Sequence, residues 1–286
     1  MPYTRIIRQS DLFPETVAPC VDPRKVCKYI YEPKFLAFEY ATLTCNPYTG
    51  CGFRCSYCSV PMITQHQNSR AKFDAGAVEK SDFLKGVALD ARRYAEAGIT
   101  DQVLLSFASD PYPPVADTTL TRKVIETIIA YQTLGFGVLT KAGERSLRDL
   151  DLFRPTMDFY AQTMISVDDA FTRKWELNTP LPGERIAVLR IVHDKYGIFI
   201  WISIEPVIDP EHALAVVRAT YPFVHHYKIG PLNYFPEVVK DVNWRDFVLR
   251  MVDLLTKVGR TAYFKKELQR YLPKGYPNPM RIPQHF

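Results

Sequence analysis

The chain has 286 residues, of which 47% are hydrophobic and 23% are charged, and its formal net charge is +5. The apolar fraction is ample for a core, which excludes a disordered chain, and the lack of a short repeat excludes collagen-like and coiled-coil folds. No stretch approaches the roughly 18 apolar residues of a membrane-spanning helix, and the N-terminus lacks the apolar core of a signal peptide. We therefore expect a cytoplasmic protein with no membrane association. The mildly basic charge permits a nucleic acid partner without requiring one.

Strand and helix patterns alternate along most of the chain, after an irregular, proline-containing arm that we expect over residues 1–35. The expected strands cover residues 36–43, 102–107, 136–140, 159–167, 198–204, 223–229 and 261–264. The expected helices cover residues 81–97, 120–134, 146–153, 182–196 and 243–258, with a further helix starting at 209–210. This alternation, with short connections, is typical of a parallel α/β sheet. The length favours a partial (β/α)6 TIM-like barrel over residues 36–265, followed by a proline-rich tail over 266–286.

All six cysteines lie in the first fifth of the chain, at Cys20, Cys27, Cys45, Cys51, Cys55 and Cys58. They are too sparse for a disulfide scaffold, and their clustering indicates a metal or cluster site in a reducing compartment. The last three have the spacing C-x3-C-x2-C, so their thiolates can converge on one soft metal centre. They follow the first expected strand, at the end where parallel barrels form active sites. A zinc site and coincident core thiols are the alternatives, and the first three cysteines could form an auxiliary site.

The motif, with Tyr57 before its last cysteine and an α/β repeat after it, resembles the radical S-adenosylmethionine (radical SAM) superfamily. The resemblance implies a barrel of the radical SAM type in which Cys51, Cys55 and Cys58 bind a [4Fe-4S] cluster. It implies that S-adenosylmethionine (SAM) chelates the open iron through its amino and carboxylate groups. It also implies an external one-electron donor of the flavodoxin or ferredoxin type.

Three further segments resemble the spore photoproduct lyase-like branch of that superfamily, and the similarity runs from about residue 36 to residue 169. They are SDPY at 109–112, TK at 140–141 and ISV at 165–167, each placed after an expected strand. In that branch a serine, a lysine and a second serine at these places contact SAM. The resemblance therefore implies SAM contacts for Ser109, Lys141 and Ser166.

The chemistry of these side chains agrees with such roles, although each has an ordinary structural alternative. Lys141 can pair with the SAM carboxylate at the barrel mouth or be a solvated surface lysine, and strand-end hydroxyls can bond polar groups of SAM or form turns. Asp110 can take the SAM ammonium or cap the following turn. Glu205 can bind substrate or the SAM ribose hydroxyls, or pair with Lys228. Strand alternation makes Lys228 a further pocket candidate.

One position departs from the lyase pattern. The true lyase has a cysteine two residues before the first serine, and that cysteine returns a hydrogen atom to the product radical, whereas this chain has Phe107 there. We therefore expect the radical machinery without the lyase reaction, and we assign no catalytic residue.

The resemblance implies an enzyme that reductively cleaves SAM at a [4Fe-4S] cluster to a 5′-deoxyadenosyl radical. That radical would remove a hydrogen atom from a substrate, either a nucleic acid or nucleoside, or a small metabolite or peptide. An iron–sulfur redox protein and a zinc-containing nucleic-acid-binding protein, neither of which cleaves SAM, are the two other classes that stay open. We expect a monomer.

Overall fold

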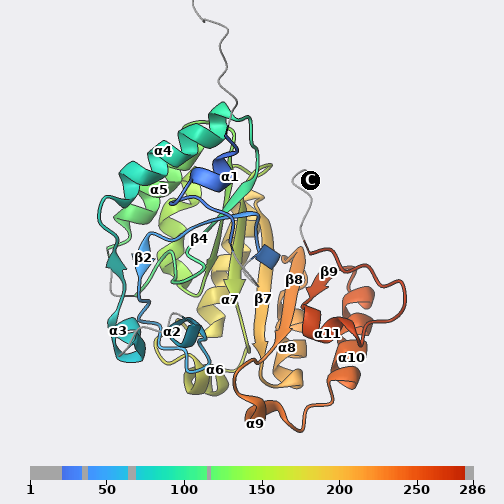
Figure 1. The fold of residues 1–286 in the computed structure, drawn as a ribbon. Coiled ribbons are helices and arrows are strands. Elements are labelled where there is room, and N and C mark those ends of the chain that lie inside the picture. Colours follow the sequence, from blue (N-terminus) through green and yellow to red (C-terminus); the bar gives the residue numbers. More distant parts are fainter. Residues whose placement is uncertain (1–20, 34–37, 64–68, 115–116, 281–286) are drawn as a thin grey trace, which may run out of the picture.

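The computed structural model describes residues 21–33, 38–63, 69–114 and 117–280. Its main feature is a curved seven-stranded sheet in the order β1-β4-β5-β6-β7-β8-β9, in which all neighbouring strands are parallel (Figure 1). The strands are β1 (Leu43–Cys45), β4 (Gln102–Leu105), β5 (Gly135–Thr140), β6 (Phe159–Thr163), β7 (Phe199–Val207), β8 (His226–Pro231) and β9 (Thr261–Phe264). Within the described ranges, β1 and β9 are the two edges of the sheet. The barrel is therefore partial, as the sequence predicts.

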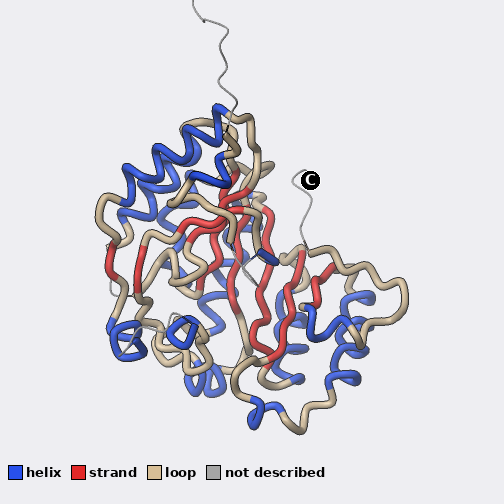
Figure 2. The backbone as a smooth tube through the Cα atoms, in the orientation of Figure 1, coloured by secondary structure: helices blue, strands red, loops and turns tan. Residues whose placement is uncertain are grey.

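Helices join successive strands, because parallel neighbours require crossover connections. The larger ones are α4 (Phe83–Glu96), α5 (Thr119–Ile129), η3 (Gly143–Leu152), α6 (Asp169–Trp175), α7 (Pro182–Ile191), η4 (Val192–Tyr196), α8 (Pro210–Thr220) and α10 (Trp244–Lys257). Short elements complete the fold: α1 (Pro23–Val26), β2 (Tyr48–Thr49), α2 (Val60–Ile63), α3 (Ser69–Ala75), β3 (Val78–Glu79), α9 (Pro236–Val239) and α11 (Lys266–Gln269). Figure 2 shows the strands at the centre with helices outside them.

Local sequence signals explain where several helices begin and which face they bury. Asp209 caps α8 by accepting a hydrogen bond from the Glu211 amide at 2.7 Å, and Pro210 occupies the first helical position. In α4, Val87, Ala91 and Tyr94 share the face that packs on the sheet and are fully buried. These signals depend on neighbours in the sequence, which is why most of the predicted elements are present.

The first predicted strand is wrong in its position. Residues 38–40 form a short turn of 3₁₀ helix, and the strand β1 starts only at Leu43, while residues 36 and 37 lie outside the described part. The carbonyl of Glu39 accepts a hydrogen bond from Lys228 Nζ on β8 at 2.6 Å. Its carboxylate accepts another from Tyr263 on β9 at 2.8 Å. Residues 38–40 therefore lie against the far edge of the sheet, and their backbone is not part of the sheet.

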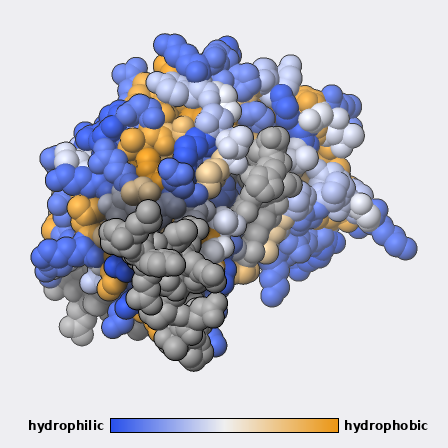
Figure 3. Space-filling view, turned by 90° about the horizontal axis from the view of Figure 1, so that it is seen from above, coloured by the Kyte–Doolittle hydropathy of each residue, from blue (hydrophilic) through white to orange (hydrophobic). Residues whose placement is uncertain are grey.

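Several other boundaries differ from the sequence prediction, which also did not include α6. The fourth predicted strand was expected to reach residue 167, but β6 ends at Thr163. The predicted helix over 182–196 is α-helical to Ile191 and continues as the π-helical turn η4. In the described part of the chain, no helix has the length and apolar character needed to cross a membrane. The face shown in Figure 3 is largely hydrophilic, with small hydrophobic areas between the polar ones.

Candidate active site

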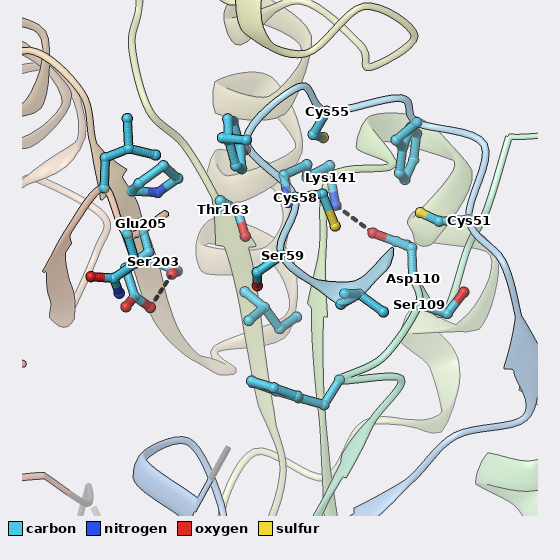
Figure 4. Close-up of a pocket in the computed structure, with 18 of the residues that line it drawn as sticks. Cys51, Cys55, Cys58, Ser59, Ser109, Asp110, Lys141, Thr163, Ser203 and Glu205 are labelled. Atoms are coloured by element: carbon cyan, nitrogen blue, oxygen red, sulfur yellow. Dashed lines mark hydrogen bonds between the residues drawn. The ribbon is translucent and has the colours of Figure 1, made fainter. Parts of the chain in front are cut away.

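A pocket of about 270 Å³ lies at the carboxyl ends of the parallel strands (Figure 4). All strands from β4 to β9 bring residues to it, at or just after their ends: Ser106, Lys141, Thr163, Glu205, Pro231 and Lys265. The cysteine loop forms one side of the pocket, and Ser203 and Glu205 of β7 lie on the opposite side. This is the end of the sheet at which the sequence predicts the site.

The three motif cysteines all line this pocket. Cys51 and Cys55 are 9% and 7% exposed, and Cys58 is half-buried. Burial raises the pKa of the Cys55 thiol to about 12, while the nearby Lys141 ammonium acts in the opposite direction. Within the described residues, no three His, Cys, Asp or Glu side chains are arranged to hold a single metal ion.

Glycine and backbone hydrogen bonds shape the cysteine loop. Gly50 has φ +77°, and a Cβ added there would collide with the carbonyl oxygen of Gly76. The Cys51 amide donates to the Phe73 carbonyl at 2.9 Å, and the Cys58 amide donates to the Cys55 carbonyl at 3.1 Å. The backbone of the cysteine loop therefore passes close to the end of α3, and a larger residue at position 50 would prevent this close contact.

The segment that follows α6 packs against the outer side of the loop. The Ser56 amide donates to the Trp175 carbonyl at 2.9 Å, and the Asn178 amide donates to the Phe53 carbonyl at 3.1 Å. The Tyr57 hydroxyl donates to the carboxylate of Glu176, which also pairs with Arg185. No local pattern connects these residues, because Tyr57 and Glu176 are 119 positions apart in the sequence.

Asp110 and Lys141 both line the pocket and are joined by a hydrogen bond. The Asp110 carboxylate accepts hydrogen bonds from the Tyr112 amide at 2.9 Å, the Thr140 hydroxyl at 2.6 Å and the Lys141 amide at 2.9 Å. Asp110 thus caps its own turn and also holds the end of β5. Lys141 lines the pocket and is half-buried, so it is not the solvated surface lysine that the sequence allowed.

The two predicted serines have different surroundings. Ser109 lines the pocket, and its hydroxyl donates to the carbonyl of Gly50. Ser166 is 2% exposed and is absent from the described pocket lining, and its Oγ lies 2.7 Å from Nδ1 of His212. Because β6 ends early, Thr163 is the hydroxyl that reaches the pocket from this strand. The sequence prediction missed Thr163 because it placed the end of the strand too late.

Glu205 lines the pocket and pairs with Lys265, with Oε1 and Nζ 2.8 Å apart. The charge of Lys228 acts on the pKa of Glu205 in the same direction as that of Lys265. Lys228 does not appear in the described pocket lining, and its Nζ donates to the Glu39 carbonyl. Lys265 makes a second ion pair with Glu39 at 3.0 Å. Burial raises the pKa of Glu205 despite the opposing Lys265 charge. The sequence prediction missed Lys265 because it comes after the last strand without any motif.

Aromatic side chains also line the pocket. Phe107 lines the pocket and packs on Tyr40, with ring centroids 5.3 Å apart. Phe107 therefore lies inside the pocket, at the position where the lyase pattern has a thiol. Cys27 and Cys45 are buried outside the described pocket lining, and Cys20 lies outside the described residues.

Comparison with known proteins places the fold. No family model and no curated protein matches the sequence. Spore photoproduct lyase complexed with dinucleoside spore photoproduct is similar with a TM-score of 0.61 and 14% identity, over 85% of this chain and 81% of the lyase chain. A mutant of that lyase with bound AdoMet and the same dinucleoside is similar with a TM-score of 0.59 and 14% identity, over 79% of this chain and 77% of the lyase chain. Streptococcus suis SuiB bound to S-adenosylmethionine is similar with a TM-score of 0.57 and 10% identity, over 84% of this chain and 51% of the SuiB chain.

Both of these proteins are radical SAM enzymes. The chain therefore has the fold of the radical SAM enzymes. Within that fold it is similar to spore photoproduct lyase, whose matched chain it covers more fully than that of SuiB.

Proposed function

We propose that this chain is a radical SAM enzyme. The observation that carries the proposal is that three thiols with C-x3-C-x2-C spacing line one pocket together with Asp110 and Lys141, at the carboxyl ends of a parallel partial barrel. When bound there, a [4Fe-4S] cluster with SAM would supply one-electron cleavage of SAM and a 5′-deoxyadenosyl radical able to remove a hydrogen atom from a substrate. The chain itself would bind, orient and shield the reactants.

Cys51, Cys55 and Cys58 would hold the cluster. Thiolates are the soft ligands that iron–sulfur clusters take, and three of them leave one iron open. Burial raises the pKa of all three thiols, so cluster binding would have to displace their protons. The Lys141 ammonium beside Cys55 and Cys58 favours the thiolate forms and offsets part of this cost.

Lys141 would pair with the SAM carboxylate, since its ammonium lies in the same pocket as the thiols. Asp110 would face the SAM ammonium, and Ser109 would bond the amino-acid part of SAM. Ser166 is the remaining predicted contact, but its hydroxyl lies against His212, so we assign the strand-end role to Thr163. These contacts depend on hydroxyl and charged groups that the described pocket lining contains.

The substrate would occupy the side of the pocket opposite the cysteine loop. That side offers the Glu205–Lys265 pair and the Tyr40 and Phe107 rings, so it suits a substrate with both polar and planar groups. A nucleic acid or nucleoside substrate is supported by similarity to a lyase that binds a dinucleoside. A peptide or small metabolite is supported by similarity to SuiB, which binds the precursor peptide SuiA. Glu205 would contact this substrate or the SAM ribose.

We further propose that residues 36–265 form the catalytic barrel, with 1–35 as an arm and 266–286 as a tail. The bond from the Phe264 amide to Asn278 at 2.6 Å supports this, because it places part of the tail against the last strand. The enzyme would act as a monomer with an external one-electron donor.

Anaerobic reconstitution with iron and sulfide, followed by assay of 5′-deoxyadenosine with SAM and dithionite, tests the function. We expect product from the wild-type chain and none from Cys51→Ala, Cys55→Ala or Cys58→Ala. Cys27→Ala is the matched control, because it removes a buried thiol outside the pocket. Product that persists in the three variants, a cluster without SAM cleavage, or zinc in place of iron would each overturn the proposal.

The substrate class is then tested by deuterium transfer. Deuterated oligonucleotides, nucleosides and peptides are incubated with the reconstituted enzyme, and 5′-deoxyadenosine is examined by mass spectrometry. Deuterium in 5′-deoxyadenosine from one class identifies that class as substrate.

A further inference from the structure

A buried carboxylate outside the thiol motif connects the cysteine loop to the end of a strand. Glu176 is fully buried at the end of α6, and its neighbours Trp175 and Asn178 bond the backbone of the cysteine loop. Cys55 and Glu176 also pair as an isolated antiparallel bridge. The loop is therefore held along its length by a segment more than a hundred positions away.

The two oxygens of the Glu176 carboxylate face different parts of the structure, and Oε2 also accepts a hydrogen bond from the Thr179 hydroxyl at 3.4 Å. Oε1 accepts from the Tyr57 hydroxyl, and Oε2 pairs with Arg185. Arg185 is 1% exposed and donates further to the Thr163 carbonyl at 2.9 Å and the Pro180 carbonyl at 3.0 Å. Tyr57, Glu176 and Arg185 thus form a continuous chain of bonds from the cysteine loop to the end of β6.

Tyr57 gives this chain a direct effect on the site. It lies between Cys55 and Cys58, lines the pocket, and is only 9% exposed. Its ring centroid is 5.9 Å from Lys141 Nζ. A hydroxyl tied at the far end of the ring restricts the ring, and with it the backbone between the two thiols. The other end of the chain, Thr163, is itself a pocket residue.

We propose that Glu176 is a positioning residue that acts through Tyr57 to hold Cys55 and Cys58 in place relative to β6. Its relevance to catalysis rests on the proposed function, because it assumes that these thiols bind the cluster. The mechanical link does not depend on that assumption. Apolar residues of similar volume often replace a buried ion pair without loss of stability. A role in positioning therefore predicts a local effect on the loop that a purely stabilising pair would not produce.

The test measures local opening of the loop in the full-length, reduced, metal-free chain. The rate at which iodoacetamide alkylates each cysteine is followed by peptide mass spectrometry, since a buried thiol reacts only when its surroundings open. Tyr57→Phe keeps the ring and removes only the hydroxyl. We expect the buried Cys55 to react at least about tenfold faster, because a hydrogen bond to a charged group is lost, and the half-buried Cys58 to react faster by a smaller factor. Cys27 is the internal reference and should keep its rate.

Tyr227→Phe is the matched control. Tyr227 is also fully buried, and its hydroxyl bonds the Thr220 hydroxyl at 2.9 Å, away from the cysteine loop. This variant should leave the rates of Cys55 and Cys58 unchanged. Equal rates in Tyr57→Phe and wild type would overturn the proposal, as would an equal acceleration of Cys27, which would show global opening.

Two variants of the carboxylate separate its hydrogen bond from its charge. Glu176→Gln can turn its single carbonyl oxygen towards Arg185 and donate from its NH₂ group to the Tyr57 hydroxyl, so it keeps a hydrogen bond to Tyr57 and should restore most of the protection that Glu176→Ala removes. If Glu176→Ala does not fold, the alkylation rates of Tyr57→Phe still test the proposal. Alkylation of Cys55 and Cys58 as fast in Glu176→Gln as in Tyr57→Phe would contradict the proposal. Failure of the wild-type chain to bind a cluster would refute the proposed function but not the link, because alkylation needs no cluster.

Discussion

The Asp110 carboxylate accepts a hydrogen bond from the backbone amide of Lys141 at 2.9 Å. This bond joins the turn after β4 to the residue that follows β5, so two strands share one anchor at the pocket. Asp110, the proposed partner of the SAM ammonium, therefore positions Lys141, the proposed partner of the SAM carboxylate. A change at either residue is expected to affect both the pocket and the stability of this end of the sheet.

Asp110→Asn should lower the free energy of unfolding by about 1–3 kcal/mol, because an amide NH₂ replaces one acceptor oxygen beside buried donors. Urea denaturation measures this loss, and equilibrium binding of SAM to the reconstituted protein should weaken in parallel. Asp253→Asn is the control, since Asp253 is 61% exposed and pairs only with Lys257 on the surface. Equal effects of the two substitutions would contradict the anchoring role of Asp110.

Gly50→Ala should prevent the cysteine loop from closing on α3. The φ of +77° is unfavourable for alanine, and its Cβ would collide with the Gly76 carbonyl. We expect reconstituted protein with most of its iron missing, measured by iron analysis and the visible spectrum. Gly183→Ala provides the comparison, because Gly183 lies in α7 with open space around it. Full iron content in Gly50→Ala would show that the loop tolerates the change.

The free energy of unfolding should fall in acid because of His226. Burial, and secondarily the Lys228 charge, lowers the pKa of His226 to about 3 in the folded chain from 6.5. Between these values the unfolded chain binds a proton that the folded chain does not, so stability is lost as the pH falls from 6.5 towards 3. The slope from this group is at most about 1.4 kcal/mol per pH unit.

His226→Leu should flatten this dependence, as measured by urea denaturation of the metal-free chain at a series of pH values. His193→Gln alters a more exposed histidine and should leave the slope unchanged. An unaltered slope in His226→Leu would assign the acid sensitivity to other groups.

Lys265→Met should be strongly destabilising at pH 8, because it leaves Glu39 and Glu205 without their shared ammonium partner. Loss of one member of a buried ion pair costs about 3–5 kcal/mol. The cost should shrink towards pH 5, since burial raises the pKa of Glu205 and its unpaired carboxyl then takes up a proton. Thermal unfolding at both pH values measures the difference, with Lys257→Met as the exposed control. A loss at pH 8 that matches the control would show that solvent compensates the two carboxylates.

The sequence by itself determined the features that depend on near neighbours. Apolar periodicity located six of the strands and most of the longer helices, although not α6, and the oxygen cap and proline at positions 209 and 210 located the start of α8. The cysteine spacing identified the loop that lines the pocket. Because successive parallel strands end on the same side, the alternation also placed Ser109, Asp110, Lys141 and Glu205 at one rim.

Only the tertiary structure decided which distant groups meet. The pairing of Glu205 with Lys265 depends on how β8 and β9 close against residue 39, and nothing local to the sequence records that. Because β6 ends at Thr163, the side chain of Thr163 lines the pocket and that of Ser166 does not. The contact of Tyr57 with Glu176 spans 119 positions and arises only when the segment after α6 packs on the loop. Such contacts are set by packing across the whole barrel, which a one-dimensional pattern does not encode.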